Sequence, residues 1–309
     1  MTDTEQSSGT RLPQPRRTAH EGFYRAFEDR FRGSRELIRS RLRIYLPFIQ
    51  PLKSIDDHPA AVDLGCGRGE WLELLAENGF DARGVDLDEG MLAACRENGL
   101  RVMKDDAIAF LKTLPNESQS IVSAFHIAEH LLFSELQMLV EQALRVLKPA
   151  GLLILETPNP ENIRVSSVTF FFDPTHRHPL PVELLSFLPE YYGFGRIKVV
   201  RLQEDRDLLE AQVASLDQVL NSASADYAII AQKAAERDVA RLFDSEFNKN
   251  FGLSVHDLTR RFDRRLEAGL ASVAELGRVR EALRASSAWA ESLQAHLLTK
   301  TEALATQEA

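Results

Sequence analysis

Cysteine is scarce in this chain, and long hydrophobic runs are absent. Two cysteines, Cys66 and Cys95, occur in 309 residues. They are too few for a disulfide framework or a zinc knuckle, which favours a reducing compartment. No apolar run is long enough to cross a bilayer, and the polar start at Met1 lacks the apolar segment of a secretory signal. We therefore expect a cytoplasmic protein.

An excess of positive charge is also lacking. The formal net charge is −9 and the pI is about 5.5, which argues against the chain as a whole being a nucleic-acid binder. Hydrophobic residues make up 44% of the sequence, enough for a sizeable core. Because the length exceeds that of a typical single domain, we expect one globular domain with additional segments.

Three glycines, Gly65, Gly67 and Gly69, follow the apolar stretch 61–64. Glycines at this spacing let the backbone turn tightly and let a ligand approach main-chain N–H groups. A dinucleotide-binding loop would place its third glycine one position later. Asp63 adds a carboxylate beside the ligand. The run resembles motif I of class I S-adenosylmethionine (SAM) methyltransferases.

Short apolar runs alternate with amphipathic helices beyond this loop, which predicts an α/β fold with helices on both faces of a sheet. We predict seven strands over 61–64, 82–85, 100–104, 121–125, 152–156, 196–201 and 226–232. Asp86 ends the second strand, from which a carboxylate reaches a ribose diol. The resemblance to class I SAM methyltransferases implies an adenine contact from Asp106 and cofactor contacts from Leu87 and Ala107.

Three titratable residues, His126, Glu129 and His130, follow the fourth predicted strand. Their spacing matches an inverzincin protease, but a protease is excluded because the motif follows a buried strand of a SAM fold and no further zincin signature occurs. In one interpretation these residues are catalytic, with His130 as general base and His126 against the cofactor. In a second interpretation, all three residues have a purely structural role.

A third interpretation is a divalent metal site formed by the same three residues. Ubiquinone-biosynthesis O-methyltransferases carry a similar Glu-x-x-Glu-His, which is thought to bind a divalent ion. Here His126 replaces the first glutamate, which favours Zn²⁺, Mn²⁺ or Fe²⁺ over Mg²⁺.

A proline-stiffened loop after the fifth predicted strand contains Asp173, His176, Arg177 and His178 behind the phenylalanines 170–172. This density of polar groups predicts an acceptor-binding site. Alternatively, Asp173 and His176 cap the next helix. Since adjacent side chains point to opposite sides, at least one phenylalanine should line the pocket.

Arginine dominates residues 11–43, which contain ten arginines and four acidic residues. Arginine is suited to hold phosphate or carboxylate, and we predict an Arg-rich helical lid over 20–58. The alternative is a solvated helix face with local ion pairs. Tyr24 and Arg32 are assigned to the cofactor and Arg25 to the acceptor. Residues 1–19 are expected to be disordered.

Several motifs together resemble the methyltransferase domain of bacterial O-antigen chain-terminating enzymes over about residues 20–235. They are residues 23–28, 31–34, 62–71, 84–86, 125–130, 155–162 and 173–179. The resemblance implies methyl transfer from SAM to a sugar hydroxyl or a terminal phosphate at the non-reducing end of a lipid-linked surface polysaccharide. Some members add a kinase domain, whose signatures are missing after residue 235.

Residues 236–309, which follow the predicted domain over 59–235, are charged and helical in pattern. An uneven apolar stripe comprises Leu283, Trp289, Leu293, Leu297 and Leu298. It favours a short coiled coil or a helix docked on the domain. Possible partners are a second copy or glycan-assembly enzymes, and a lipid-linked acceptor allows peripheral membrane association at the inner face of the inner membrane.

Two rival functions are O-methylation of a small lipid such as a quinone precursor, and a non-catalytic scaffold that acts through the tail. Asp63, Asp86 and Asp106 disfavour the scaffold because they suit cofactor binding.

Overall fold

A computed structural model describes residues 33–307, with their side chains as far as residue 301. Tyr24, Arg25, Arg32 and the segment 1–19 lie outside the described residues. Among the described helices, none has both the length and the apolar composition needed to cross a membrane.

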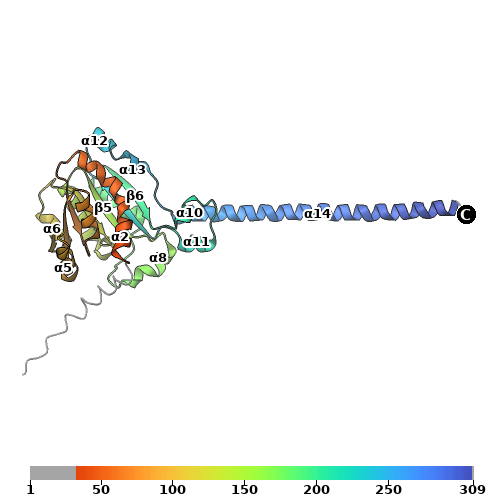
Figure 1. Cartoon of the computed structure of the whole chain (residues 1–309), viewed down its shortest axis with the longest axis horizontal. Helices are drawn as coiled ribbons and strands as arrows, with labels where there is room; N and C mark the ends of the chain where they lie inside the picture. Colours follow the sequence, from red (N-terminus) through yellow and green to blue (C-terminus); the bar gives the residue numbers. More distant parts are fainter. Residues whose placement is uncertain (1–32, 308–309) are drawn as a thin grey trace, which may run out of the picture.

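A seven-stranded sheet forms the centre of the fold (Figure 1). Its strands are β1 (Ala60–Leu64), β2 (Asp81–Asp86), β3 (Val102–Lys104), β4 (Gln119–Phe125), β5 (Leu147–Pro158), β6 (Arg196–Leu202) and β7 (Asp226–Gln232). Their order is β3-β2-β1-β4-β5-β7-β6. Strands β1 to β5 are parallel, and β7 is antiparallel to both neighbours. The predicted α/β class and seven strands are confirmed.

Only β7 has its predicted range, and the other strands differ by one or two residues at an end, except that β5 begins five residues earlier. β3 begins at Val102 rather than residue 100, because the amide of Leu100 donates to the carbonyl of Cys95 and stays tied to the preceding helix. β5 begins at Leu147 because its register with β4 shifts. Ala150 takes a left-handed φ of 64° within that irregular part.

Helices cover both faces of the sheet. The longer helices are α2 (Arg35–Leu42), α4 (Glu70–Glu77), α5 (Glu89–Glu97), α6 (Ala107–Thr113), α7 (Phe133–Val146), α9 (Val182–Tyr192) and α14 (Val255–Gln307). The shorter ones are η1 (Arg43–Tyr45), α3 (Leu46–Ile49), η2 (Gln50–Ser54), η3 (Ala128–His130), α8 (Ile163–Ser167), η4 (Thr169–Phe172), α10 (Arg206–Glu210), α11 (Leu216–Asn221), α12 (Arg237–Arg241) and α13 (Asp244–Asn248).

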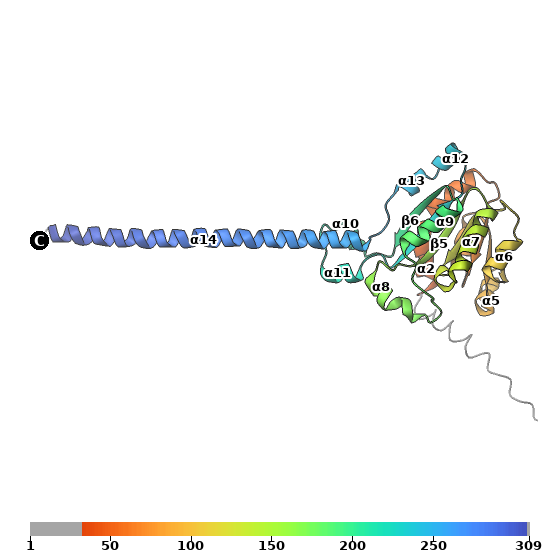
Figure 2. The same ribbon diagram turned by 180° about the vertical axis from the view of Figure 1, so that it is seen from behind.

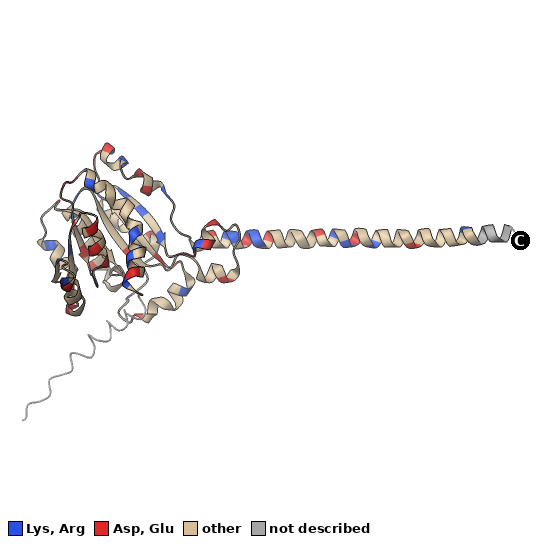
Figure 3. Ribbon diagram, in the orientation of Figure 1, with Lys and Arg blue, Asp and Glu red and all other residues tan. Residues whose placement is uncertain are grey.

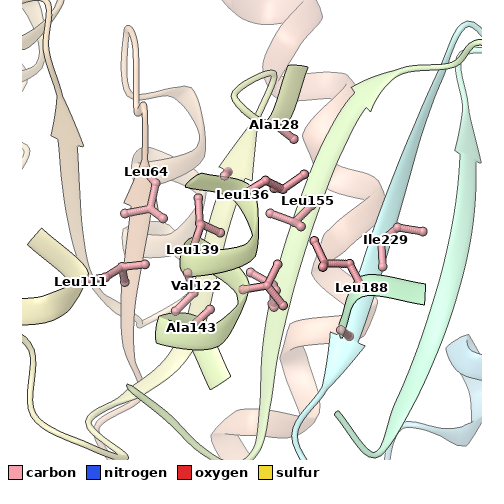
Figure 4. Close-up of a cluster of buried hydrophobic side chains, with 14 of the residues drawn as sticks. Leu64, Leu111, Val122, Ala128, Leu136, Leu139, Ala143, Leu155, Leu188 and Ile229 are labelled. Carbon is pink, nitrogen blue, oxygen red and sulfur yellow. The ribbon is translucent and has the colours of Figure 1, made fainter. Parts of the chain in front are cut away.

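One hydrophobic core lies on each face of the sheet. On the face seen in Figure 2, Leu139 and Ala143 of α7 and Leu188 of α9 pack against Val122 and other strand residues, as Figure 4 shows in detail. On the opposite face, α2, α3 and α4 pack against another set of apolar strand side chains. Burial of both faces explains why the central strands are continuous apolar runs.

The segment 35–54 packs as a layer of the domain, and the Arg-rich lid over 20–58 stays a prediction. Tyr45, Phe48 and Ile49 are fully buried in the core. Arg35 and Arg39 of α2 form ion pairs across to α4, with Arg35 Nη2 at 2.6 Å from Glu73 Oε1. These arginines therefore fasten α2 to α4 rather than pairing locally.

Helix α14 leaves the domain as a single extended helix (Figure 1). Its first turns pack on the domain, where Leu258 is buried with Val219 of α11. All described residues from 263 to 301 are exposed, and basic and acidic side chains occur together along this part (Figure 3). A coiled coil formed by α14 stays a prediction.

Candidate active site

The three glycines form a cradle after β1. Gly65, Gly67 and Gly69 have φ values of 65°, 50° and 81°, a left-handed conformation that favours glycine. A Cβ on Gly65 would lie 2.1 Å from Cδ1 of Ile127. A side chain at position 65 would therefore collide with the segment that follows β4, and the positive φ values keep the turn after β1 tight.

Carboxylates flank this cradle as predicted. Asp86 Oδ2 accepts a hydrogen bond from the Gly67 amide at 2.9 Å, and its Oδ1 accepts one from the Asp88 amide at 2.8 Å. Asp63 is buried and accepts from the Ser123 hydroxyl at 2.7 Å. Leu87 is 65% exposed, an apolar surface beside Asp86. That Asp63, Asp86 and Leu87 contact SAM stays a prediction, and the structure places all three beside the cradle.

The predicted adenine contact Asp106 has a structural role as well. Its Oδ1 caps α6 by accepting hydrogen bonds from the amides of Ile108 and Ala109, and Ala107 is the first residue of that helix. An adenine contact from Asp106 would use its other oxygen.

A cavity of about 460 Å³ opens beside the cradle. It is lined by Ile38, Arg41, Leu42, Asp63, Gly65, Cys66, Glu70, Trp71, Phe125, His126, His130, Glu156, Thr169, Phe172, Asp173, His176, Gln203 and Asp226. This is where open α/β sheets bind ligands, at the carboxyl ends of their parallel strands. Phe172 is among the lining residues, whereas Phe170 is buried, so the expectation of one pocket-lining phenylalanine is confirmed.

His126 holds three carboxylates together at the end of β4. Its Nδ1 lies 3.2 Å from Glu129 Oε1, and its Nε2 lies 3.3 Å from Glu156 Oε1 and 3.9 Å from Asp226 Oδ2. Burial lowers the pKa of His126, but the bonds to Glu129 and Glu156 outweigh it and raise the pKa well above its ordinary value. The ring is therefore a charged imidazolium, which is unsuited to act as a base.

The same cluster contains functional residues that the sequence analysis missed. Tyr45 donates a hydrogen bond to Glu156, and Gln203 donates one to Asp226. Burial raises the pKa of Asp226 to about 6. Glu156 occupies a strand's carboxyl end, a position that marks binding residues in such sheets. The place of Tyr45, 111 residues away from Glu156, had no sequence signal.

His130 lies on η3 and belongs to a different group from His126. Its Nδ1 is 2.9 Å from Oγ1 of Thr175, and its ring packs edge-on against His176 with centroids 4.7 Å apart. Burial lowers the pKa of His130 below its ordinary value. At neutral pH the ring is therefore uncharged, and one of its nitrogens has a free lone pair.

The predicted acceptor loop is fastened to η3. The Arg177 amide donates to the Glu129 carbonyl at 2.9 Å, and Nε of Arg177 donates to the His130 carbonyl at 2.8 Å. His176 Nδ1 donates to the Phe170 carbonyl at 2.6 Å. Asp173 and His176 line the cavity, whereas His178 is exposed and is not among its lining residues.

The helix-capping alternative for this loop is wrong. α9 begins at Val182 with Pro181 at its N-cap, and no side chain caps it. Asp173 instead accepts hydrogen bonds from the amide and hydroxyl of Thr175.

The predicted metal trio of His126, Glu129 and His130 does not form one ligand cluster among the described residues. Its members fall into two separate groups. One consists of Glu129, His130 and His176, and the other of His126, Glu156 and Asp226. Within each group the possible ligand atoms lie within 4.8 Å of one another. The difference arises because His126 lies in the bend after β4 with a left-handed φ of 56°, and η3 is a single 3₁₀ turn. The two histidines therefore do not share a helical face.

Comparisons with known proteins agree with this geometry. A family model for a methyltransferase domain matches residues 62–155. The ubiquinone biosynthesis O-methyltransferase of Methylococcus capsulatus is 35% identical over 120 residues, which are 37% of this chain and 49% of that protein. A probable S-adenosylmethionine-dependent methyltransferase of Mycolicibacterium smegmatis is 32% identical over 134 residues, 43% of this chain and 51% of that protein. The chain thus spans about half the length of these curated relatives.

A solved structure is similar over its whole length. The SAM-dependent methyltransferase from Archaeoglobus fulgidus is 36% identical to this chain, with a TM-score of 0.60. The match covers 68% of this chain and 100% of that chain. Because the sheet, the glycine cradle and this similarity agree, the chain belongs to the SAM-dependent methyltransferases.

Proposed function

We propose that the protein transfers a methyl group from SAM to a sugar hydroxyl at the non-reducing end of a lipid-linked surface polysaccharide such as O-antigen, and so terminates the chain. The observation that carries the hydroxyl acceptor is His130, an uncharged imidazole that lines the cavity beside the cradle. The polysaccharide rests on the resemblance of residues 125–130 and 173–179 to the chain-terminating enzymes. A lipid-linked acceptor would place the reaction at a membrane surface.

A sugar hydroxyl needs a proton acceptor to react at neutral pH, because it is too weak an acid to ionise by itself. Bound SAM would supply an electrophilic methyl group. The bond between the sulfonium sulfur and the methyl carbon would break as the acceptor oxygen bonds to that carbon, S-adenosylhomocysteine would leave, and His130 would take the hydroxyl proton. A base of this kind contributes roughly 10²–10⁴-fold to the rate. Glu129 does not accept the proton itself. Its pKa is held below the ordinary value, so it stays ionised and acts on His126 and His130 through its negative charge.

The charge of the cavity favours a hydroxyl over a phosphate acceptor. Its lining includes the carboxylates of Asp63, Glu70, Glu156, Asp173 and Asp226. Among the described lining residues, the cations are Arg41 and the His126 imidazolium, against these five carboxylates. Carboxylates accept hydrogen bonds from sugar hydroxyls, whereas they repel an anionic phosphate.

A second candidate is a small aromatic acceptor such as a quinone precursor. Trp71, Phe125 and Phe172 give the cavity an aromatic lining, and the Methylococcus relative is a ubiquinone biosynthesis O-methyltransferase. The same base chemistry would serve a phenol.

Transfer of labelled methyl tests the two acceptors against each other. The purified protein is incubated with methyl-labelled SAM and, in parallel, with extracted lipid-linked polysaccharide or with a catechol-type quinone precursor. We expect label at the polysaccharide terminus, and its loss with His130→Ala. Label in the quinone precursor alone would overturn the polysaccharide assignment. Mass analysis of glycan termini from cells with and without the protein provides an independent check.

A further inference from the structure

Asp173 and Thr175 form a hydrogen-bonded chain that ends on the ring of His130. The Thr175 hydroxyl donates to Asp173 Oδ1 at 2.6 Å, and the Thr175 amide donates to the same oxygen at 2.8 Å. The hydroxyl oxygen lies 2.9 Å from Nδ1 of His130. The sequence Asp-Pro-Thr forms this arrangement locally, because an aspartate readily bonds to the amide two residues later.

The direction of these hydrogen bonds follows from which of the groups carry a proton to donate. Burial raises the pKa of Asp173, but the two bonds from Thr175 outweigh it and hold the pKa below its ordinary value. Asp173 is therefore an ionised carboxylate that can only accept. The single hydroxyl proton of Thr175 points to Asp173, so the hydroxyl oxygen accepts from His130. Consequently Nδ1 of His130 carries the proton, and Nε2 carries the lone pair.

We propose that Thr175 and Asp173 are positioning residues that hold His130 in the tautomer with its proton on Nδ1, which leaves Nε2 free to act as the base. The inference rests on the proposed function, because it requires His130 to accept the acceptor's proton. In Ser-His-Asp triads the carboxylate bonds to the imidazole directly and sets the same tautomer. Here a threonine hydroxyl stands between the carboxylate and the ring.

Neighbouring residues hold the hydrogen-bonded chain from Asp173 to His130 in place, and the packing of the Thr175 side chain is not needed for this. Asp173 is 7% exposed, whereas Thr175 itself is exposed. Two residues later, Arg177 is fastened to the carbonyls of Glu129 and His130. Removing the Thr175 hydroxyl should therefore break one hydrogen bond and leave the core intact. The charged or titratable groups that act on His130 are Glu129, His176, Asp173 and His126.

The test combines the tautomer of His130 with kinetics in the full-length protein. Nitrogen-15 NMR of labelled histidine, in excess chelator, identifies His130 by the signal that His130→Ala removes. We expect the Nδ1–H tautomer in the parent and a mixture of tautomers in Thr175→Val. The kcat of that variant should fall about 10-fold or more, but less than for loss of the base, with the KM for SAM unchanged. Thr175→Ser should restore both readouts.

Thr113→Val is the matched control, because the Thr113 hydroxyl bonds within α6 to the Phe110 carbonyl. A parent spectrum with the proton on Nε2 would overturn the inference, as would an unchanged tautomer and kcat in Thr175→Val. If His130→Ala instead keeps full kcat, the base role itself fails. That result is distinct, because it does not depend on the tautomer that the spectra report.

Discussion

Removing the His126 imidazolium should destabilise the protein strongly, although the residue lies at the active site. In His126→Ala, the buried carboxylates Glu129 and Glu156 and the half-buried Asp226 lose their shared positive partner. Breaking a buried ion pair in this way costs about 3–5 kcal/mol. Because the His126 side chain is 30% exposed, solvent screens part of the charge, and we expect the lower end, about 3 kcal/mol. For a domain of this size, that lowers Tm by roughly 6–12 °C.

The loss of stability in His126→Ala should depend on pH, and the direction of that dependence follows from the pKa of His126. The pKa of His126 is raised in the folded state, so its stabilisation is fully present below the unfolded-state pKa of about 6.5. It is lost as the pH rises through the folded-state pKa. In the variant, acidification protonates the crowded carboxylates and relieves their repulsion. The difference in unfolding free energy between parent and variant should therefore be largest near neutral pH and become smaller at both acidic and alkaline pH.

Urea unfolding at acidic, neutral and alkaline pH measures this difference. His256→Ala is a suitable control, because His256 is exposed. Equal unfolding free energies for parent and His126→Ala at neutral pH would refute the imidazolium assignment. A loss of similar size at every pH would point to lost packing rather than lost charge.

Three further perturbations address the cofactor and the chemistry. Asp86→Ala should weaken SAM binding about 10–100-fold by calorimetry, because it removes a charged hydrogen-bond acceptor; parental affinity would disprove the ribose assignment. His130→Ala should lower kcat roughly 10²–10⁴-fold with near-normal SAM affinity. Arg177→Ala removes the side-chain bond to the His130 carbonyl, so on a hydroxyl acceptor it should lower kcat less than His130→Ala does, and on a phosphate acceptor it should lower kcat more. Excess chelator should leave turnover of the base-catalysed reaction unchanged, and activity restored only by added Mn²⁺ or Zn²⁺ would favour the metal interpretation.

Much of the fold could be predicted because its signals are local. Strands buried on both faces leave continuous apolar runs, and the glycine cradle needs positive φ values that only certain residues tolerate. The grouping of His130 with Asp173 and His176 was also predictable in outline, since both segments follow parallel strands whose carboxyl ends meet at one edge. Their connection through Thr175 could not be predicted, because the sequence does not show which side chains its hydroxyl contacts.

The part of the site that could not be predicted depends on the last strands of the sheet. Asp226 begins β7, and in a parallel strand it would lie at the opposite edge from His126. Because β7 is antiparallel to β5, its first residue instead meets the carboxyl end of β5, where Pro158 pairs with Asp226 and Thr157 with Tyr227. A third carboxylate thereby joins Glu129 and Glu156 around one imidazole. The hydrogen bonds to Glu129 and Glu156 raise the pKa of His126 most, and the charge of Asp226 adds to that effect. His126 is therefore suited to hold these carboxylates together, and His130 stays the residue that we propose as the base.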